Sequence, residues 1–390
     1  MLNGLDDVNW AGLAHAYGPA ADVPGQIRDL LSPDASVRER ALWSLHGNIY
    51  HQGTIYQATA HAVPFLLEVL ESPECRVRAE LLVLLTGIVT GFDEMWLPEG
   101  MPVAERREQA IGGDVVLASA PGFDPESWGD LDDDEPLSDE DMGRLYSYIW
   151  VSAYDAVRAG VPLFRRLLRS EPAVRCMAAY ALAWFPEDAE ESLRALAAIP
   201  ADGDGEGVVA ATASVATGLL GGRPATGLDD PRPLARWGAA IALATVECRE
   251  TPDEAVEVLV AAASGEMGED ERVPFLDGNL AAYAGAALRL TGDRHADRTL
   301  DALLGHLSTV SGVSALHVLQ EALQLAFPSP PQDRVGYPEL DDRQRRLAGT
   351  LAASPQAWLL EGRNFGNIGM LLFEYKLPST YETMREYVTS

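Results

Sequence analysis

Apolar positions along the chain recur at helical spacing, in segments separated by proline-containing breaks. Between residues 55 and 69 they advance by 3, 4, 3 and 4, which is one face of an α-helix. These positions are Ile55, Ala58, Ala62, Phe65 and Val69. After a break at Pro73, a second helix is predicted from Val77, Leu81, Leu84 and Ile88. Neither helix can bury its stripe alone, so the pattern predicts pairs of helices stacked side by side.

The pair is repeated along the chain. Residues 23–38, 63–78 and 161–175 each contain Val-Pro, a leucine-rich turn, a Ser-Pro or Glu-Pro break and then Val-Arg. Arg38 and Arg78, which end the first two copies, are 40 residues apart. Looser copies of the helical pattern follow at Val208–Leu220, Leu234–Val246, Val273–Leu290 (again with Val-Pro), Leu300–Leu307 and Val313–Phe327.

Two further features repeat with the helices. Tyr56 and Tyr154 each lie eight residues before the Val-Pro proline, so we expect them at equivalent positions, packing between units. An arginine begins the second helix of several units, and we expect it to pair with acids or carbonyls of the neighbouring unit rather than to form an anion-binding ladder. These arginines are Arg38, Arg78, Arg175 and Arg236.

The chain resembles the HEAT-repeat family. The period of 40 fits, and one unit supplies the whole line D-x-x-V-R-x-x-A-x-x-x-L. Its residues are Asp34, Val37, Arg38, Ala41 and Leu45. The segment HQGTIYQATAHAVPFLLEVL (51–70) is similar to a bacterial HEAT-like subfamily. The resemblance covers residues 10–325 with one interruption. It implies an all-α, right-handed α-solenoid of about seven to eight helical hairpins, often a scaffold for binding proteins, and no particular chemistry.

An acidic insertion interrupts the repeats. Residues 92–143 contain 16 acidic residues, and their only cations are Arg106 and Arg107. We interpret them as a long loop or short-helix insertion. The predicted organisation is a solenoid over 1–327 carrying this insertion, a proline-rich linker over 328–340 and a helical cap over 341–390.

The composition disfavours nucleic-acid-binding, membrane-spanning and secreted proteins. The 390 residues include 29 basic and 59 acidic ones, a net charge of −30, which disfavours binding to nucleic acid or to an anionic membrane. No apolar run approaches the ~18 residues of a membrane span, and Met1–Trp10 shows no secretory signal. The three cysteines are distant and odd in number, as expected for a reducing cytoplasm.

The candidate site residues are polar or aromatic positions beside the repeats. Gln57, His61 and Glu68 lie opposite the apolar stripe of their helix, and Trp128 lies beside a run of acids, as an interface anchor does. The predicted partner-binding residues are His51, Tyr56, Gln57, His61, Glu68, Trp128, Asp132, Asp133, Asp134, Tyr154 and Asp155. The histidine spacings match no metal motif, and nucleotide-binding and hydrolase motifs are absent, so we expect no metal, cofactor or catalytic residue.

Two functions remain open. The first is a non-enzymatic protein-binding scaffold, in its sharper form an acidic inhibitor or immunity-type protein that neutralises a basic partner. The alternative is an enzyme or DNA-repair-like protein with a cleft on the first three repeats. Alkylpurine DNA glycosylases share the HEAT-like fold and have tryptophans around a catalytic aspartate, which Trp150, Tyr154 and Asp155 resemble only loosely. The net charge of −30 argues against DNA binding. The oligomeric state stays open.

Overall fold

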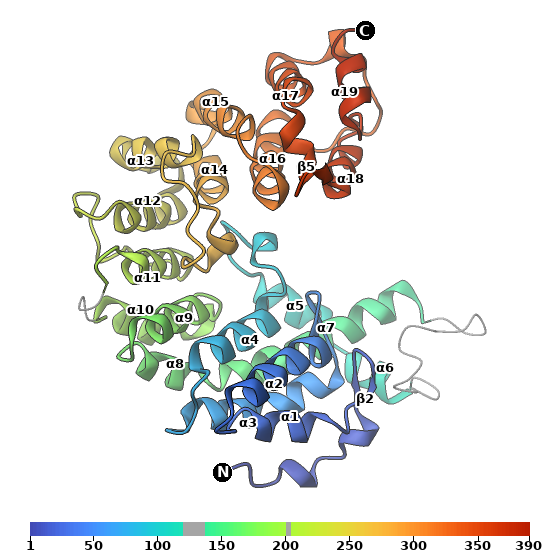
Figure 1. The fold of residues 1–390 in the computed structure, drawn as a ribbon, viewed down its shortest axis with the longest axis vertical. Coiled ribbons are helices and arrows are strands. Elements are labelled where there is room, and N and C mark those ends of the chain that lie inside the picture. Colours follow the sequence, from blue (N-terminus) through green and yellow to red (C-terminus); the bar gives the residue numbers. More distant parts are fainter. Residues whose placement is uncertain (120–136, 200–203) are drawn as a thin grey trace. The chain divides into compact units, whose positions relative to one another are not determined.

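The computed structural model describes residues 1–119, 137–199 and 204–390. In these residues the chain forms nineteen α-helices and three short β-hairpins, so the predicted all-α class is confirmed (Figure 1). None of the helices described is long and apolar enough to cross a membrane. Contacts divide the chain into two compact units, Met1–Gly203 and Asp204–Ser390, and each is described by itself.

Unit 1 contains ten helices among its described residues. They are α1 (Val23–Asp29), α2 (Ala35–Asn48), α3 (Gln57–Glu71), α4 (Arg78–Thr90), α5 (Val103–Gln109), α6 (Gly113–Ser119), α7 (Asp139–Arg158), α8 (Val161–Leu167), α9 (Pro172–Leu182) and α10 (Ala189–Ala197). Helix α1 packs on α2, α3 on α4, and α8 on α9. Contacts also join α1 to α3 and α2 to α4, while α3 packs on α7 and α4 on α9. Within unit 1, each pair therefore lies against the next.

The helix predicted from the apolar positions 55–69 is confirmed as α3, and the helix predicted after the break at Pro73 is confirmed as α4. Every position of the predicted apolar stripe from residue 55 to 69 is buried, although Ile55 itself belongs to a strand. The α4 stripe is also buried: Val77, Leu81, Leu84 and Ile88.

The predicted equivalence of Tyr56 and Tyr154 is wrong. Helix α3 runs through its Val-Pro pair, whereas the same pair at 161–162 begins the separate helix α8. Tyr56 therefore lies immediately before a helix, and Tyr154 lies in the middle of α7. The helix is broken at Gly160, just before the Val161-Pro162 pair, because glycine is a poor helix former.

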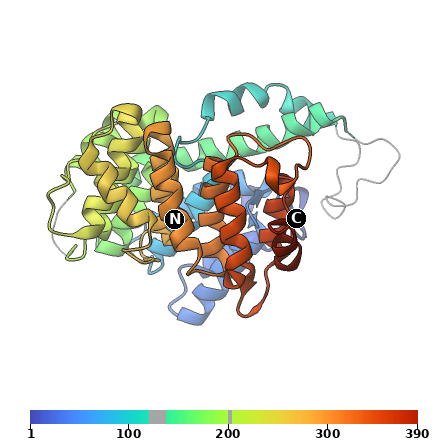
Figure 2. The ribbon, with the colours of Figure 1, turned by 90° about the horizontal axis from the view of Figure 1, so that it is seen from above.

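Residues 92–119 and 137–143 are the described parts of the predicted insertion, and they lie in the chain between α4 and residue 144 of α7. They include the short helices α5 and α6, both packed on α7 (Figure 2). Helix α7 begins at Asp139, inside the predicted insertion, with the Ser138 hydroxyl accepting a hydrogen bond from the Asp141 amide as an N-cap.

Two β-hairpins lie between helices of unit 1. Strands β1 (Ala14–His15) and β2 (Gly18–Pro19) pair before α1, and β3 (Tyr50–His51) and β4 (Thr54–Ile55) pair before α3. The second hairpin turns through Gln52 (φ 48°) and Gly53 (φ 82°), the left-handed pair that two-residue hairpin loops require.

Unit 2 contains nine helices and one hairpin. They are α11 (Val208–Leu219), α12 (Pro233–Glu247), α13 (Asp253–Ala263), α14 (Leu280–Leu290), α15 (Ala296–Leu307), α16 (Gly312–Ala326), α17 (Asp342–Ala353), α18 (Gly366–Glu374) and α19 (Tyr381–Tyr387), with β5 (Leu359–Leu360) paired to β6 (Arg363–Asn364). Successive helices pack from α11 to α17, and α12 also contacts α14, as α14 contacts α16. A Cβ on Gly238 would lie 2.5 Å from the Ala211 backbone, so only glycine permits the close approach of α11 and α12.

The Val-Pro pair of unit 2, Val273-Pro274, does not begin an α-helix. The predicted helix over Val273–Leu290 is reduced to α14, preceded by a 3₁₀ turn at Phe275–Gly278. Leu276 (φ 51°) and Asp277 (φ 50°) are left-handed in this turn, which no α-helix accommodates.

Residues 328–336 contain no helix or strand, and the 3₁₀ turn Tyr337–Glu339 follows them. The Tyr387 hydroxyl of α19 donates a hydrogen bond to the carbonyl of Val335 at 2.9 Å. The end of the chain is therefore fastened to this segment.

Candidate functional site

The first hairpin of unit 1 presents Tyr17 beside His51. The Tyr17 ring meets the His51 ring edge-on at 5.4 Å, and the hydroxyl lies 3.4 Å from His51 Nδ1. Buried His15 holds this turn, because its Nδ1 accepts from the Tyr17 amide and its Nε2 lies 3.0 Å from Asp22 Oδ1. Tyr17 itself is 68% exposed.

The polar residues predicted to form a row on α3 have different surroundings: two are hydrogen-bonded to the N-terminal segment, and one is exposed. Gln57 Oε1 accepts from the Ala14 amide at 3.4 Å, and Glu68 Oε2 accepts from the Leu2 amide at 2.6 Å. His61 is exposed. Tyr56 is buried, and burial raises the pKa of its phenol, so it is packed rather than presented to a partner.

Trp43, which is not among the residues predicted from the sequence, is 82% exposed on α2. Gly47, one turn later on the same helix, lies under the Tyr17 ring, where a Cβ would be 3.8 Å from the ring edge. A helical-wheel reading of α2 would have shown Trp43 lying off the buried positions Ala41, Leu42 and Leu45.

The two arginines of the insertion turn inward onto α7. The Arg106 guanidinium lies between two indoles, 4.7 Å from the Trp96 centroid and 4.8 Å from the Trp150 centroid. Both indole N–H groups donate to carbonyls at the end of α4, Trp150 to Val89 at 3.0 Å and Trp96 to Thr90 at 2.6 Å. Burial lowers the pKa of Arg106 from its ordinary value.

Arg107 binds two carboxylates. Its Nη1 and Nη2 donate to Asp155 at 3.0 and 2.5 Å, and its Nη2 and Nε donate to Glu187 Oε1 at 2.9 and 3.2 Å. The guanidinium also lies 5.5 Å from the Tyr154 ring centroid. These hydrogen bonds, first to Asp155 and then to Glu187, raise the pKa of Arg107.

Tyr154 is fully buried, and its hydroxyl donates to Glu187 Oε2 at 2.7 Å and to the Trp184 carbonyl at 3.2 Å. Burial, together with the hydrogen bond to Glu187, raises the pKa of the phenol. The structure thus brings Tyr154 and Asp155 together around Arg107. The other predicted insertion residues, Trp128 and Asp132, Asp133 and Asp134, lie outside the described residues.

Exposed carboxylates remain on the described flanks of the insertion. Five of them have no ion-pair partner among the residues that the structure describes: Glu99, Glu105, Glu108, Asp114 and Asp139. Because both cations of the insertion are turned inward, this surface keeps an uncompensated negative charge.

The four repeated arginines bind backbone carbonyls, as predicted, but not those of a neighbouring unit. Arg38, Arg78, Arg175 and Arg236 donate to the carbonyls of Ser32, Ser72, Ser170 and Asp230 respectively. These acceptors lie in the turn just before each arginine's own helix, and not in a neighbouring unit. The nearby acid Asp34 does not pair with Arg38 but caps α2, its carboxylate accepting a hydrogen bond from the Ser36 amide.

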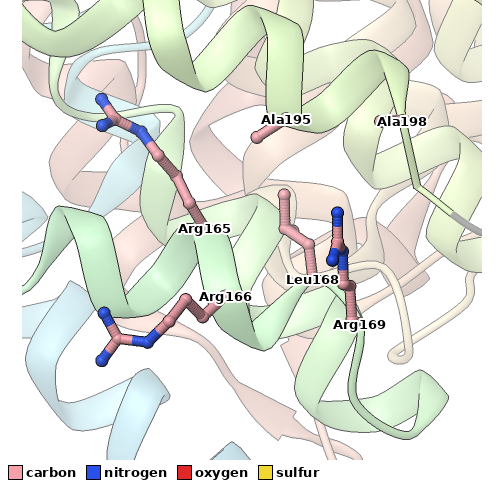
Figure 3. A pocket seen from close by; sticks show the side chains of 6 residues that line it. All are labelled: Arg165, Arg166, Leu168, Arg169, Ala195 and Ala198. Atoms are coloured by element: carbon pink, nitrogen blue, oxygen red, sulfur yellow. The ribbon is translucent and has the colours of Figure 1, made fainter.

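A cavity of about 480 Å³ lies between α8 and α10 (Figure 3). Its lining consists of Arg165, Arg166, Leu168, Arg169, Ala195 and Ala198. Arg165 is paired with Glu191, and Arg166 with Glu71. The lining of this cavity includes none of the partner-binding residues predicted from the sequence.

Across residues 1–119, 137–199 and 204–390, no cluster of three or more His, Cys, Asp or Glu side chains is placed to hold a metal ion.

Comparison with known proteins assigns no relative. No family model and no curated protein matches the chain. Among solved structures, the chain is similar to an engineered protein determined by crystallography, at 16% identity over 95% of this chain and 99% of that one, with a TM-score of 0.28. At that TM-score the similarity carries no argument about fold or function, so the HEAT resemblance stays a prediction.

Proposed function

We propose that this protein is a non-enzymatic protein-binding scaffold that holds a basic protein partner on the acidic surface of unit 1. The observation that carries the proposal is the orientation of charge in the insertion. Arg106 and Arg107 are turned onto α7, while Glu99, Glu105 and Glu108 are exposed. Such a surface attracts cationic proteins and repels phosphate backbones.

The scaffold itself is proposed to be a right-handed α-solenoid of about seven to eight HEAT-like hairpins. In unit 1 its support is the contact pattern α1–α2, α3–α4 and α8–α9, with α4 packed on α9 across the insertion. In unit 2 it is the packing of α12 on α14 and of α14 on α16. Stacked hairpins produce this pattern of contacts with the next helix and the next but one.

The contacts of the candidate catalytic residues favour a scaffold over an enzyme. Asp155 is bound by Arg107, and the buried Tyr154 hydroxyl is bound to Glu187. Because the pKa of the Tyr154 phenol is raised, the phenol stays protonated at neutral pH and cannot act as a general base. The sharper form of the proposal is an inhibitor or immunity-type protein that neutralises a basic partner.

The experiment is affinity purification from the native host at low salt, with mass spectrometry. The bait variant is Glu105→Gln/Glu108→Gln/Asp114→Asn, which neutralises three exposed acids of α5 and α6. The matched control neutralises three exposed acids of unit 2: Glu271→Gln, Glu382→Gln and Glu386→Gln.

We expect a protein of high isoelectric point that the wild type and the control variant retain, and that the insertion variant loses by about tenfold or more. Retention should also fall as salt is raised. If no basic protein is recovered, or if both variants lose it equally, the proposal is wrong.

A further inference from the structure

Arg106 and Arg107 occupy two adjoining sites of different chemistry. The first is a slot between the Trp96 and Trp150 rings, and the second is a bidentate carboxylate site made by Asp155 and supplemented by Glu187. An aromatic slot and a carboxylate fork are the two kinds of site that recognise a guanidinium better than an ammonium ion.

Contacts that do not involve α5 hold the walls of both sites. The Trp150 and Trp96 indoles are fixed by hydrogen bonds to the Val89 and Thr90 carbonyls at the end of α4. Glu187 is fixed by the Tyr154 hydroxyl and by Arg158, whose Nη1 lies 3.1 Å away. The two indoles and Glu187 are therefore held in place without Arg106 or Arg107, whereas Asp155 is positioned by the backbone of α7.

Besides the two arginines, helix α5 contacts α7 through Gln109, whose Oε1 accepts a hydrogen bond from the Ser147 hydroxyl at 3.5 Å. Of its seven residues, only Val103 is buried. Left-handed glycines lie near both of its ends, Gly100 (φ 91°) and Gly112 (φ 84°). The two arginines supply the ion pairs and cation–π contacts of α5, and Arg107 is 32% exposed, so its carboxylate site is open to solvent.

We propose that Trp96, Trp150, Asp155 and Glu187 form a receptor for a pair of consecutive arginine side chains, which Arg106 and Arg107 occupy in cis. The ligand class is an arginine-arginine segment of a basic protein, which takes the place of α5 when this helix lifts. The inference shares with the proposed function the inward orientation of the two arginines, but it concerns a site beneath the insertion and not the exposed acids upon it, so the two can fail separately.

The probe is the blocked dipeptide acetyl-Arg-Arg-amide, with acetyl-Lys-Lys-amide as the comparison. In Arg106→Ala/Arg107→Ala the receptor is vacant, and tryptophan fluorescence reports a ligand entering between the two indoles. We expect the vacant variant to bind the arginine peptide at least about tenfold more tightly than the wild type does, and to prefer it to the lysine peptide by a similar factor. Adding Asp155→Asn should remove most of that gain.

The matched control is Arg144→Ala, which removes an arginine of α7 paired with Glu140 and Asp141, away from both sites. This variant should bind the arginine peptide no better than the wild type. Equal binding of the two peptides by the vacant variant, or no gain over the wild type, overturns the inference while leaving the exposed acids free to bind a partner.

A second measurement uses the unaltered chain, so that it does not depend on the variant folding. Glu105 and Glu108 flank the two arginines and are exposed, so a glutamate-specific protease cuts there when α5 lifts. The arginine peptide should accelerate this cleavage severalfold and the lysine peptide should not. Equal rates with both peptides contradict the inference.

Discussion

The hairpin before α3 in unit 1 and the hairpin before α18 in unit 2 have the same strand register and the same kind of turn. The helices that follow them differ in how much they bury. The pairs Tyr50–Ile55 and His51–Thr54 correspond to Leu359–Asn364 and Leu360–Arg363. Both turns use two left-handed residues, Gln52-Gly53 and Glu361-Gly362. The helix follows directly in each case, so a constant offset of 309 residues relates the two segments.

The helices then diverge. Helix α3 has 15 residues, eight of them buried, and it packs on α1, α4 and α7. Helix α18 has nine residues, three of them buried, and it exposes Met370 and Phe373. The turn sequence thus determines the hairpin locally, whereas the surrounding helices determine how far the next helix extends and what it buries.

The largest expected difference is at Phe65 and its counterpart Glu374. Phe65 is 8% exposed and contacts the Trp10 ring at 6.4 Å, whereas Glu374 is exposed. Phe65→Ala should lower the free energy of unfolding of unit 1 by about 3 kcal/mol, and Glu374→Ala should change that of unit 2 by less than about 0.5 kcal/mol. Amide hydrogen exchange within α3 and α18 measures the two effects separately. Similar effects at both sites would contradict the burial difference.

The two turn glycines are a matched pair. Both have positive φ, but a Cβ on Gly53 would lie 2.6 Å from the Phe92 ring, and a Cβ on Gly362 would meet nothing within 4 Å. Gly362→Ala should therefore cost about 1 kcal/mol of backbone strain, and Gly53→Ala about 2 kcal/mol. Urea unfolding measures both. Adding Phe92→Ala should bring the cost of Gly53→Ala down to that of Gly362→Ala, and failure to do so would show that the clash is not the cause.

Thr59 links the start of the β3–β4 hairpin to α3. Its buried hydroxyl donates to the Ile49 carbonyl at 2.6 Å and accepts from the Tyr56 amide at 2.9 Å, and its counterpart in unit 2 is the apolar Ile368. Thr59→Val keeps the shape and leaves two backbone groups unpaired, at a cost of about 1 kcal/mol. Thr59→Ser, which keeps the hydroxyl, is the control. If the two variants unfold at the same urea concentration, the hydrogen bonds contribute nothing.

The smallest effect concerns pH. Burial lowers the pKa of His46, whose ring meets Tyr50 edge-on at 6.0 Å, below its ordinary value of 6.5. The unfolded chain therefore binds more protons, so this contribution to stability is present above pH 6.5 and is lost as the pH falls below it. The equivalent position in unit 2 is Pro355. His46→Gln should flatten the pH dependence of exchange in α3 without affecting α18, and an unchanged profile would refute the assignment.

The sequence predicted the helices best where apolar spacing and tertiary packing agree, as in α3 and α4. It failed where a local conformation overrode the motif: Gly160 broke the helix before the third Val-Pro pair, and Leu276 and Asp277 did so in unit 2. The hairpins were missed because their strands have only two residues each, too short for an alternating pattern.

Of the candidate site, the sequence pointed to Tyr154 and Asp155 but not to the residues that bind them. Arg107 binds Asp155, 48 residues away in the chain, and Glu187, 80 residues away, and no spacing rule reveals either pairing. Arg106 and Arg107 were noted only as the exceptions in an acidic run. Their contacts with α7 depend on the tertiary fold.

The arrangement at Arg107 underlies both proposals, and a double-mutant cycle tests it directly. Unfolding free energies of the wild type, Arg107→Ala, Asp155→Ala and the double variant give the coupling between the two side chains. For a half-exposed bidentate pair we predict a coupling of about 1 kcal/mol, after allowance for solvent screening. A coupling indistinguishable from zero would contradict the account, because Arg107 would then not be bound where the structure places it.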